Sequence, residues 1–265
     1  MLKKLYDKSK IWFSVFWIVL YCVLMSVADA ISQTVGMEKA LSAPVALLLS
    51  GGLLAFLWRH GLLREYGLCK SRASAKSMLF YLPLLLLPVI NFMSGFGMRY
   101  GAAESVLYVL CMLCVGFLEE IIFRGLLFLA MYKDTPRAAI AVSSITFGIG
   151  HIINLINGSG ADLLSNLLQV AYASAAGFMF VMIFVRSESL LACIVAHGVF
   201  NALSAFCPDP DTVAVEILSA LALILVSGAY GLWLVLMPWV GKGTQERAHA
   251  SPYNRDNKNA EDAQR

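Results

Sequence analysis

The stretch VLYVLCMLCVGFLEEIIFRGLLFLAM, residues 106–131, decides the fold class. It is long enough to cross a bilayer once, because a spanning helix needs about 20 residues. Yet it carries Glu119, Glu120 and Arg124 within six residues. Each ionised side chain at the centre of a membrane helix costs roughly 2.5–3.5 kcal/mol on insertion scales, and such residues normally face the interior of a helical bundle. The stretch therefore predicts a membrane helix that carries part of a functional site.

The composition of the whole chain agrees with a membrane protein. Of its 265 residues, 59% are hydrophobic and 14% are charged, whereas about a quarter are charged in a typical soluble domain. Eight apolar stretches are candidate spans: Ile11–Ser32, Leu41–Trp58, Met78–Met93, Val106–Met131, Ala138–Ile156, Leu163–Val185, Leu190–Phe206 and Val213–Val240. The alternation of apolar and polar residues that is typical of membrane β-strands is absent. We therefore expect an all-α, polytopic transmembrane bundle of about eight spanning helices.

Lysines and arginines are distributed unequally between the two ends of this predicted bundle. With eight spans, one end receives only Lys39 and Arg99, Arg124 lies within a span, and all the others fall at the opposite end. Because basic residues are enriched in cytoplasmic loops, both termini are expected in the cytoplasm of a multi-pass protein of the cell (inner) membrane. Topology therefore accounts for the formal net charge of +3, and no nucleic-acid partner is expected.

The strongly polar side chains are concentrated in three of the spans. The fourth span carries EEIIFR (119–124), the fifth carries FGIGH (147–151), and the seventh carries HGVFN (197–201). Glu119 and His151 are each fourteen residues from the basic residue that ends their helix, and His197 and Asn201 are eleven and fifteen residues from theirs. At 1.5 Å per residue, all four lie roughly 16–23 Å from the cytoplasmic edge. This shared depth favours one composite site.

Helical spacing indicates which side chains can meet. Glu120 and Arg124 are four residues apart, so we expect an ion pair within the helix; a purely structural role for that pair is the alternative. Glu119 is turned about 100° away and can face another helix. His197 and Asn201 are also four residues apart, so both can donate hydrogen bonds to one oxygen atom. A carboxylate and an imidazole from separate helices can activate water, and paired donors can stabilise the oxyanion formed from an amide.

At these residues the sequence resembles the CPBP family of intramembrane endopeptidases, which includes the type II CAAX prenyl proteases and bacterial Abi or bacteriocin-processing relatives. The family pattern is EExxxR, FxxxH and HxxxN on separate membrane helices in that order. All three motifs are present without departure, and the resemblance covers about residues 103–206. The resemblance implies an intramembrane endopeptidase that acts on a membrane-associated peptide or protein.

The resemblance also implies a role for individual residues. It implies that Glu119 is the water-activating base and that His151 assists it. Arg124 would orient the acidic pair, with Glu120 as its closest partner. His197 and Asn201 would be the two oxyanion donors. Phe147 lies on the same helix face as His151, one turn away, and we expect it to contact the substrate.

The chain is expected to divide around this core. Residues 103–206 would form the catalytic core, preceded by N-terminal transmembrane helices in 1–102 and followed by a last transmembrane helix in 207–240. The polar tail 241–265 has no apolar stripe, so we expect it to be disordered. The basic start of the chain and the small residues at 28–30 resemble a signal peptide. However, the apolar region is too long for one, so an uncleaved first helix is expected.

No cofactor is expected, although zinc is an alternative. The family was long described as metallopeptidases, and two histidines with carboxylates could bind zinc. However, HExxH is absent, and the resemblance favours a glutamate-based mechanism that is independent of metal. Cys111 and Cys114 have CxxC spacing but lie among apolar residues, where cysteine usually serves as small hydrophobic filler.

Two functions of other classes remain open at this point. Glutamate and histidine could carry protons in a proton-coupled transporter, although the halved repeats common in transporters are not found. A non-catalytic scaffold that binds a membrane partner is the other alternative. In a scaffold, alanine at Glu119 or His151 would leave the cellular phenotype intact.

Overall fold

The computed structural model describes residues 2–155 and 162–237, so the tail 241–265 lies outside the described residues. All regular structure in this part of the chain is helical. Seven helical runs are long and apolar enough to cross a membrane: Lys10–Val35, Ser42–Arg59, Lys76–Ser94, Ala102–Tyr132, Pro136–Leu155, Leu163–Ser187 and Val213–Leu236. A shorter apolar run covers Leu191–Phe206 and corresponds to the seventh predicted span. The predicted all-α, multi-pass membrane bundle is confirmed.

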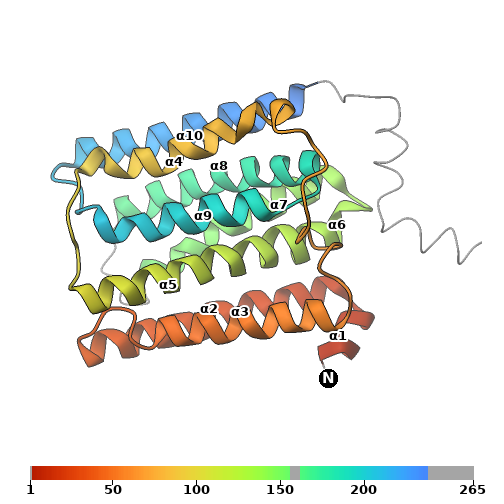
Figure 1. Ribbon diagram of the computed structural model, residues 1–265, viewed down its shortest axis with the longest axis horizontal. Coiled ribbons are helices and arrows are strands. Elements are labelled where there is room, and N and C mark those ends of the chain that lie inside the picture. Colours follow the sequence, from red (N-terminus) through yellow and green to blue (C-terminus); the bar gives the residue numbers. More distant parts are fainter. Residues whose placement is uncertain (1, 156–161, 238–265) are drawn as a thin grey trace, which may run out of the picture.

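The helices form layers (Figure 1). They are α1 (Leu2–Lys8), α2 (Lys10–Val35), α3 (Ser42–Arg59), α4 (Leu82–Asn91), α5 (Ala102–Glu119), α6 (Leu129–Tyr132), α7 (Pro136–Gly150), α8 (Leu163–Ser187), α9 (Leu191–Leu203) and α10 (Val213–Leu236). One outer layer contains α2 and α3, the opposite layer contains α4 and α10, and the remaining long helices lie between them. Helix α5 packs against α3 and α9, and α8 packs against α7 and α10. The motif-bearing helices α5, α7 and α9 therefore lie in the middle layers of the bundle.

Several helix ends follow from local sequence. The Ser9 side chain accepts a hydrogen bond from the backbone N–H of Trp12 and caps α2, as serine commonly does at this position. The same helix ends at Gly36, whose φ of 73° lies in the left-handed region that glycine adopts without strain. At α8, the Asp162 side chain accepts from the backbone N–H groups of Leu164 and Ser165. These caps satisfy backbone groups that the helices leave unpaired.

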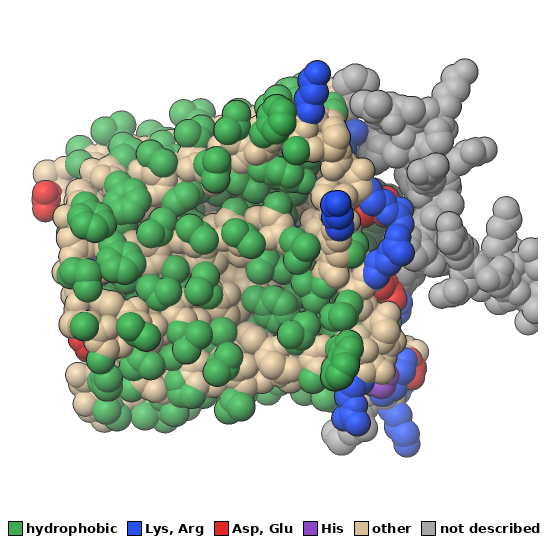
Figure 2. All heavy atoms as spheres, viewed as in Figure 1, with side chains coloured by type: hydrophobic (Ala, Val, Ile, Leu, Met, Phe, Trp, Pro, Cys, Tyr) green, Lys and Arg blue, Asp and Glu red, His purple; other side chains and the backbone are tan. Residues whose placement is uncertain are grey.

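The surface of the bundle separates into an apolar side wall and two polar ends (Figure 2). Hydrophobic side chains cover the wall, and Lys and Arg side chains gather at one end. We call the end that includes Arg59, Arg72 and Lys76 the basic end. The far end is the opposite one, formed by residues 95–101 and 207–212. This distribution is the one expected for a protein whose wall faces lipid.

Two of the motif-bearing spans depart from the regular α-helix that their spacing predicts. The fourth span changes at Glu120–Phe128 to a π-helix, η3, before α6 resumes. The fifth span continues beyond α7 as a 3₁₀ turn, η4, at His151–Leu155. Turns of π-helix are rare and occur often at functional sites. Both irregular segments begin at a motif residue, so the backbone departs from ideal geometry where the polar side chains are held.

Helices α5 and α9 approach each other closely at Gly116 and Gly198. A Cβ added at Gly116 would lie 2.6 Å from the backbone nitrogen of Gly198 and 2.7 Å from its Cα. Backbone atoms cannot swing away as a flexible side chain can, so the two helices could not remain this close. Small residues permit such contacts in membrane bundles. This contact fixes the position of α9 along the axis of α5.

Replacing Gly116 by alanine is expected to lower the free energy of unfolding by about 1–3 kcal/mol, because overpacking forces the helices apart. Thermal unfolding of the purified protein in detergent measures this effect. Gly150→Ala is the matched control, since a Cβ there meets no atom within 4 Å. Equal unfolding midpoints for the two variants would contradict the importance of the α5–α9 contact.

Candidate active site

The two glutamates of the fourth span are buried at the junction between α5 and the π-helical segment. Glu119 is the last residue of α5, and Glu120 is the first residue of η3. Arg124 Nη1 lies 3.0 Å from Glu120 Oε1, so the ion pair expected from the four-residue spacing is present, with both side chains fully buried. The Arg124 guanidinium carbon also lies 4.0 Å from the centre of the Phe147 ring. The arginine is therefore held by a charge on one side and an aromatic face on the other.

His197 of α9 joins the two glutamates. Its Nδ1 lies 2.8 Å from Glu120 Oε1, and its Nε2 lies 3.4 Å from Glu119 Oε2. The imidazole ring stacks on Phe180 of α8, with 5.7 Å between the ring centroids. A single imidazole thus contacts both carboxylates, and its ring plane is fixed by an aromatic neighbour.

Tyr21 of α2 supplies a contact to Glu119 that the sequence analysis did not anticipate. The Tyr21 hydroxyl donates a hydrogen bond of 2.7 Å to Glu119 Oε1, and both side chains are buried. A signal was available, because Tyr21 is eleven residues from Lys10. It therefore lies about 16 Å from the basic end, at the depth of the other polar residues. Because membrane tyrosines are usually assigned to the interface, the depth of Tyr21 does not by itself identify it as a site residue.

A small cavity of about 50 Å³ borders the cluster on the side of α7, α8 and α9. Its wall includes Phe147, His151, His197 and Asn201. The ring of Phe147 lies 5.4 Å from that of His151 and 5.6 Å from that of His197, both centroid to centroid. Ser227 of α10 also lines this cavity. The FxxxH and HxxxN motifs therefore border one small cavity, and His197 connects it to the glutamates of the EExxxR motif.

The site residues predicted from sequence fall into two groups. Glu119, Glu120, Arg124 and His197 form a connected buried cluster. Phe147, His151 and Asn201 line the adjoining cavity with His197. The histidine in direct contact with Glu119 is His197 of α9, whereas the resemblance assigns the assisting role to His151. His151 begins the 3₁₀ turn after α7, and its backbone carbonyl accepts a hydrogen bond of 2.7 Å from Asn166 Nδ2.

The polar side chains of the cluster do not match a metal site. A catalytic zinc site uses three protein ligands in tetrahedral geometry with one open position. Within residues 2–155 and 162–237, His, Cys, Asp and Glu side chains form no group of three or more that could hold a metal ion. In the cluster, Nδ1 of His197 is already committed to Glu120. The residues present therefore do not fit zinc.

Comparison with known proteins identifies the core. A family model described as "Type II CAAX prenyl endopeptidase Rce1-like" matches residues 101–203. No curated protein and no solved structure matches the chain. The matched segment begins next to the predicted core boundary and contains all three motifs, and its buried Glu119, Glu120 and His197 cluster is consistent with a catalytic site. Residues 101–203 therefore form a domain of the type II CAAX prenyl endopeptidase Rce1-like family, whose members are intramembrane proteases.

Proposed function

We propose that this protein hydrolyses a peptide bond of a membrane-associated polypeptide with a water molecule activated by Glu119. The observation that carries the proposal is the environment of the Glu119 carboxylate. One oxygen accepts from the Tyr21 hydroxyl, while the other, Oε2, is buried, lies 3.4 Å from His197 Nε2 and has no hydrogen bond of good geometry in the described residues. A buried acceptor without a donor is costly, and a water molecule poised for attack would satisfy it. The carboxylate is thus oriented through one oxygen and free to take a proton through the other.

Contacts to the two glutamates orient the His197 imidazole. Its Nδ1 lies 2.8 Å from Glu120 Oε1, and its Nε2 lies 3.4 Å from Glu119 Oε2. A hydrogen on Nε2 would therefore point toward Glu119 and the bound substrate.

The proposed reaction balances without any further reagent. Glu119 accepts a proton from water as the oxygen attacks the carbonyl carbon of the scissile amide. His197 and Asn201, one helical turn apart on the cavity wall, donate hydrogen bonds to the oxyanion that forms. Glu119 then transfers its proton to the leaving nitrogen, and the C–N bond breaks to give a carboxylic acid and an amine. His151, which lines the same cavity, assists the proton transfers, and Phe147 contacts the bound polypeptide.

The test of this proposal compares peptides released from membranes with and without the glutamate. Cells that express the wild-type chain or Glu119→Ala are fractionated, and peptides from the membrane fraction are quantified by mass spectrometry. We expect a set of cleavage products that require Glu119. Identical peptide sets from variants of equal abundance in the membrane would rule out the proposed activity and favour a non-catalytic role.

Tyr21→Phe is expected to reduce kcat about 10- to 100-fold with little change in KM. The substitution removes one hydrogen bond to the charged Glu119, and such bonds contribute about 1.5–3 kcal/mol. A loss of 1.36 kcal/mol corresponds to a factor of ten in rate. Steady-state cleavage by the purified variant measures both constants. The split between kcat and KM separates a role in orienting Glu119 from a general loss of folded protein.

The control for Tyr21→Phe is Tyr230→Phe. Tyr230 also has a buried hydroxyl, but this hydroxyl donates a hydrogen bond of 2.8 Å to the backbone carbonyl of Met78, away from the glutamates. We expect this control to lose stability without the selective fall in kcat. If both variants lost the same fraction of kcat, Tyr21 would have a structural role only.

We also propose that the basic end faces the cytoplasm of the cell, in an inner membrane. The unequal distribution of Lys and Arg supports this orientation. In intact cells, a membrane-impermeant thiol reagent should label Asp211→Cys at the far end but not Lys76→Cys at the basic end. The reverse pattern would invert the topology.

A further inference from the structure

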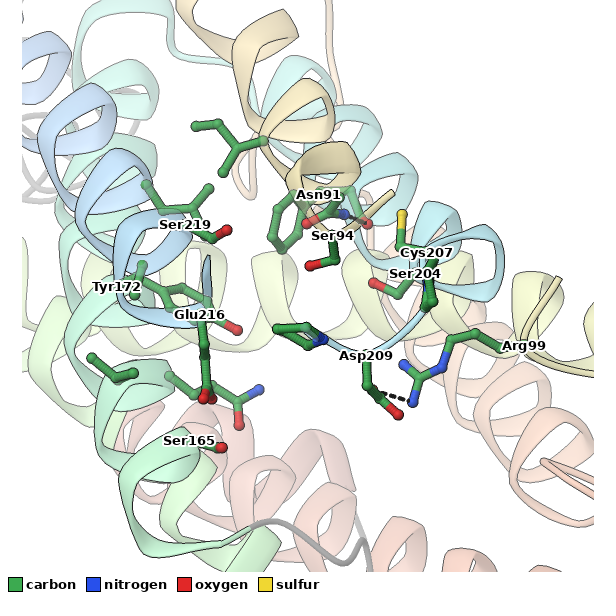
Figure 3. A pocket seen from close by; sticks show the side chains of 18 of the residues that line it. Asn91, Ser94, Arg99, Ser165, Tyr172, Ser204, Cys207, Asp209, Glu216 and Ser219 are labelled. Atoms are coloured by element: carbon green, nitrogen blue, oxygen red, sulfur yellow. Dashed lines mark hydrogen bonds and ion pairs between the residues drawn. The ribbon is translucent and has the colours of Figure 1, made fainter. Parts of the chain in front are cut away.

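A second, much wider cavity opens at the far end of the bundle (Figure 3). It has a volume of about 650 Å³ and lies among α4, α8, α9 and α10. At its mouth Arg99 Nη2 and Asp209 Oδ1 form an ion pair of 2.7 Å, and the Asp209 side chain is 79% exposed. Its volume is in the range of ligand-binding cavities, about 300–1,000 Å³. The cavity therefore gives access to the bundle interior from the end that carries few basic residues.

The wide cavity meets the small cavity of the active site. Gln169, Tyr172, Phe200 and Leu223 line both of them. The small cavity is also lined by the two motif histidines, His151 and His197, and by Asn201. A chain that occupied the wide cavity would thus arrive next to the catalytic residues.

One face of α10 follows this path along its length. Glu216 and Ser219 line the wide cavity, Leu223 lines both, and Ser227 lines the small one. Their spacing of three or four residues puts them on one side of the helix. The hydroxyl oxygens of Ser219 and Ser227 are buried without a hydrogen-bond partner in the described part of the chain. Ser227 is fully buried. Unpartnered buried hydroxyls are uncommon and point to a ligand or water that completes them.

The chemistry of the walls fits the backbone of an extended polypeptide. Polar groups along the wide cavity include Asn91, Ser94, Ser165, Gln169 and Ser204. Inside a membrane, the N–H and C=O groups of an unwound segment need partners from protein or water. Hydroxyl and amide side chains supply both donors and acceptors. An apolar prenyl chain would displace water from these side chains without forming hydrogen bonds to them, which is unfavourable.

The length of the path gives the size of the bound segment. Glu216 and Ser227 are eleven residues apart on α10, which corresponds to about 16 Å. An extended chain covers about 3.3 Å per residue, so about five residues fit along this face. Because α10 lies outside the matched residues 101–203, this face is a feature of the chain beyond the family domain.

We propose that the wide cavity binds an extended segment of about five residues, without a lipid modification, and leads it from the far end to Glu119. This assignment rests on the proposed function, since it names the route and the kind of substrate for the same catalytic residues. With the basic end in the cytoplasm, the protein would cleave membrane proteins at segments presented from the opposite side of the membrane.

The test labels the cavity after the protein has folded. In a Cys207→Ala background, chosen because Cys207 also lines the cavity, Ser219→Cys is purified and reconstituted with the membrane proteins of the expression host. A charged, membrane-impermeant thiol reagent is then added, and Glu119-dependent peptides are counted by mass spectrometry before and after labelling. We expect rapid labelling and at least a tenfold loss of these peptides. Cleavage sites should lie in segments on the far-end side of their proteins.

The matched control is Leu218→Cys in the same background. Leu218 neighbours Ser219 on α10 but is 55% exposed on the outer wall, where lipid excludes a charged reagent. It should label at least tenfold more slowly and retain cleavage. Slow labelling of Ser219→Cys, or labelling that leaves cleavage unchanged, would overturn the assignment and leave the proposed function standing. If the wild-type chain released no Glu119-dependent peptides, the proposed function would fall and the assignment with it.

Discussion

Glu119→Gln is expected to reduce kcat for peptide-bond cleavage about 10²- to 10⁴-fold while the protein stays folded. Glutamine retains the shape of the side chain and can still accept the hydrogen bond from Tyr21, which is 2.7 Å long in the wild-type protein. It cannot take a proton from water, and general-base catalysis contributes about 10²–10⁴ in rate. Steady-state cleavage by the purified variant in detergent or proteoliposomes measures the loss.

Glu65→Gln is the control for this loss. Glu65 pairs with Lys10 at 3.0 Å at the basic end and is partly exposed, so its removal should change the free energy of unfolding by less than about 1 kcal/mol. We expect wild-type cleavage from this variant. Glu119→Gln with more than about a tenth of wild-type kcat would show that another group activates the water.

Arg124→Met is expected to lower the free energy of unfolding by about 3–5 kcal/mol. Arg124 and Glu120 are both fully buried, 3.0 Å apart, and removing one member of such a pair leaves an uncompensated charge. The substitution also deprives Glu120 of the partner that holds it against His197, so cleavage should fall with stability. Denaturant unfolding in mixed micelles, followed by circular dichroism, gives the free energy, and the cleavage assay gives the rate.

Two further variants separate charge from packing at Arg124. The double variant Glu120→Gln, Arg124→Met removes both charges and should recover much of the stability but none of the activity, because His197 loses its carboxylate partner. Arg72→Met breaks an exposed ion pair with Glu188, whose side chains are each 43% exposed, and should change stability by less than about 1 kcal/mol. An Arg124→Met protein as stable as Arg72→Met would refute the energetic role of the buried pair.

Much of the site follows from the sequence because helical geometry relates residue number to depth and direction. The four-residue spacing of Glu120 and Arg124 predicts their ion pair, and the structure contains it at 3.0 Å. Similar distances from the basic helix ends, fourteen and eleven residues, predict that Glu119 and His197 share a layer, and they are in contact. Both arguments need only the 1.5 Å rise and the 100° turn of a helix. The all-α membrane fold follows in the same local way, from apolar runs of spanning length.

The tertiary structure alone determines which groups meet within that layer. Spacing along α9 does not reveal that His197 contacts both carboxylates, because the contact depends on how closely α5 and α9 approach at Gly116 and Gly198. Likewise, nothing in the motifs indicates that Tyr21, about a hundred residues earlier, orients Glu119. Depth and phase are properties of a single helix, and the sequence determines them. Distances between helices result from packing along their whole length, so only the folded bundle decides them.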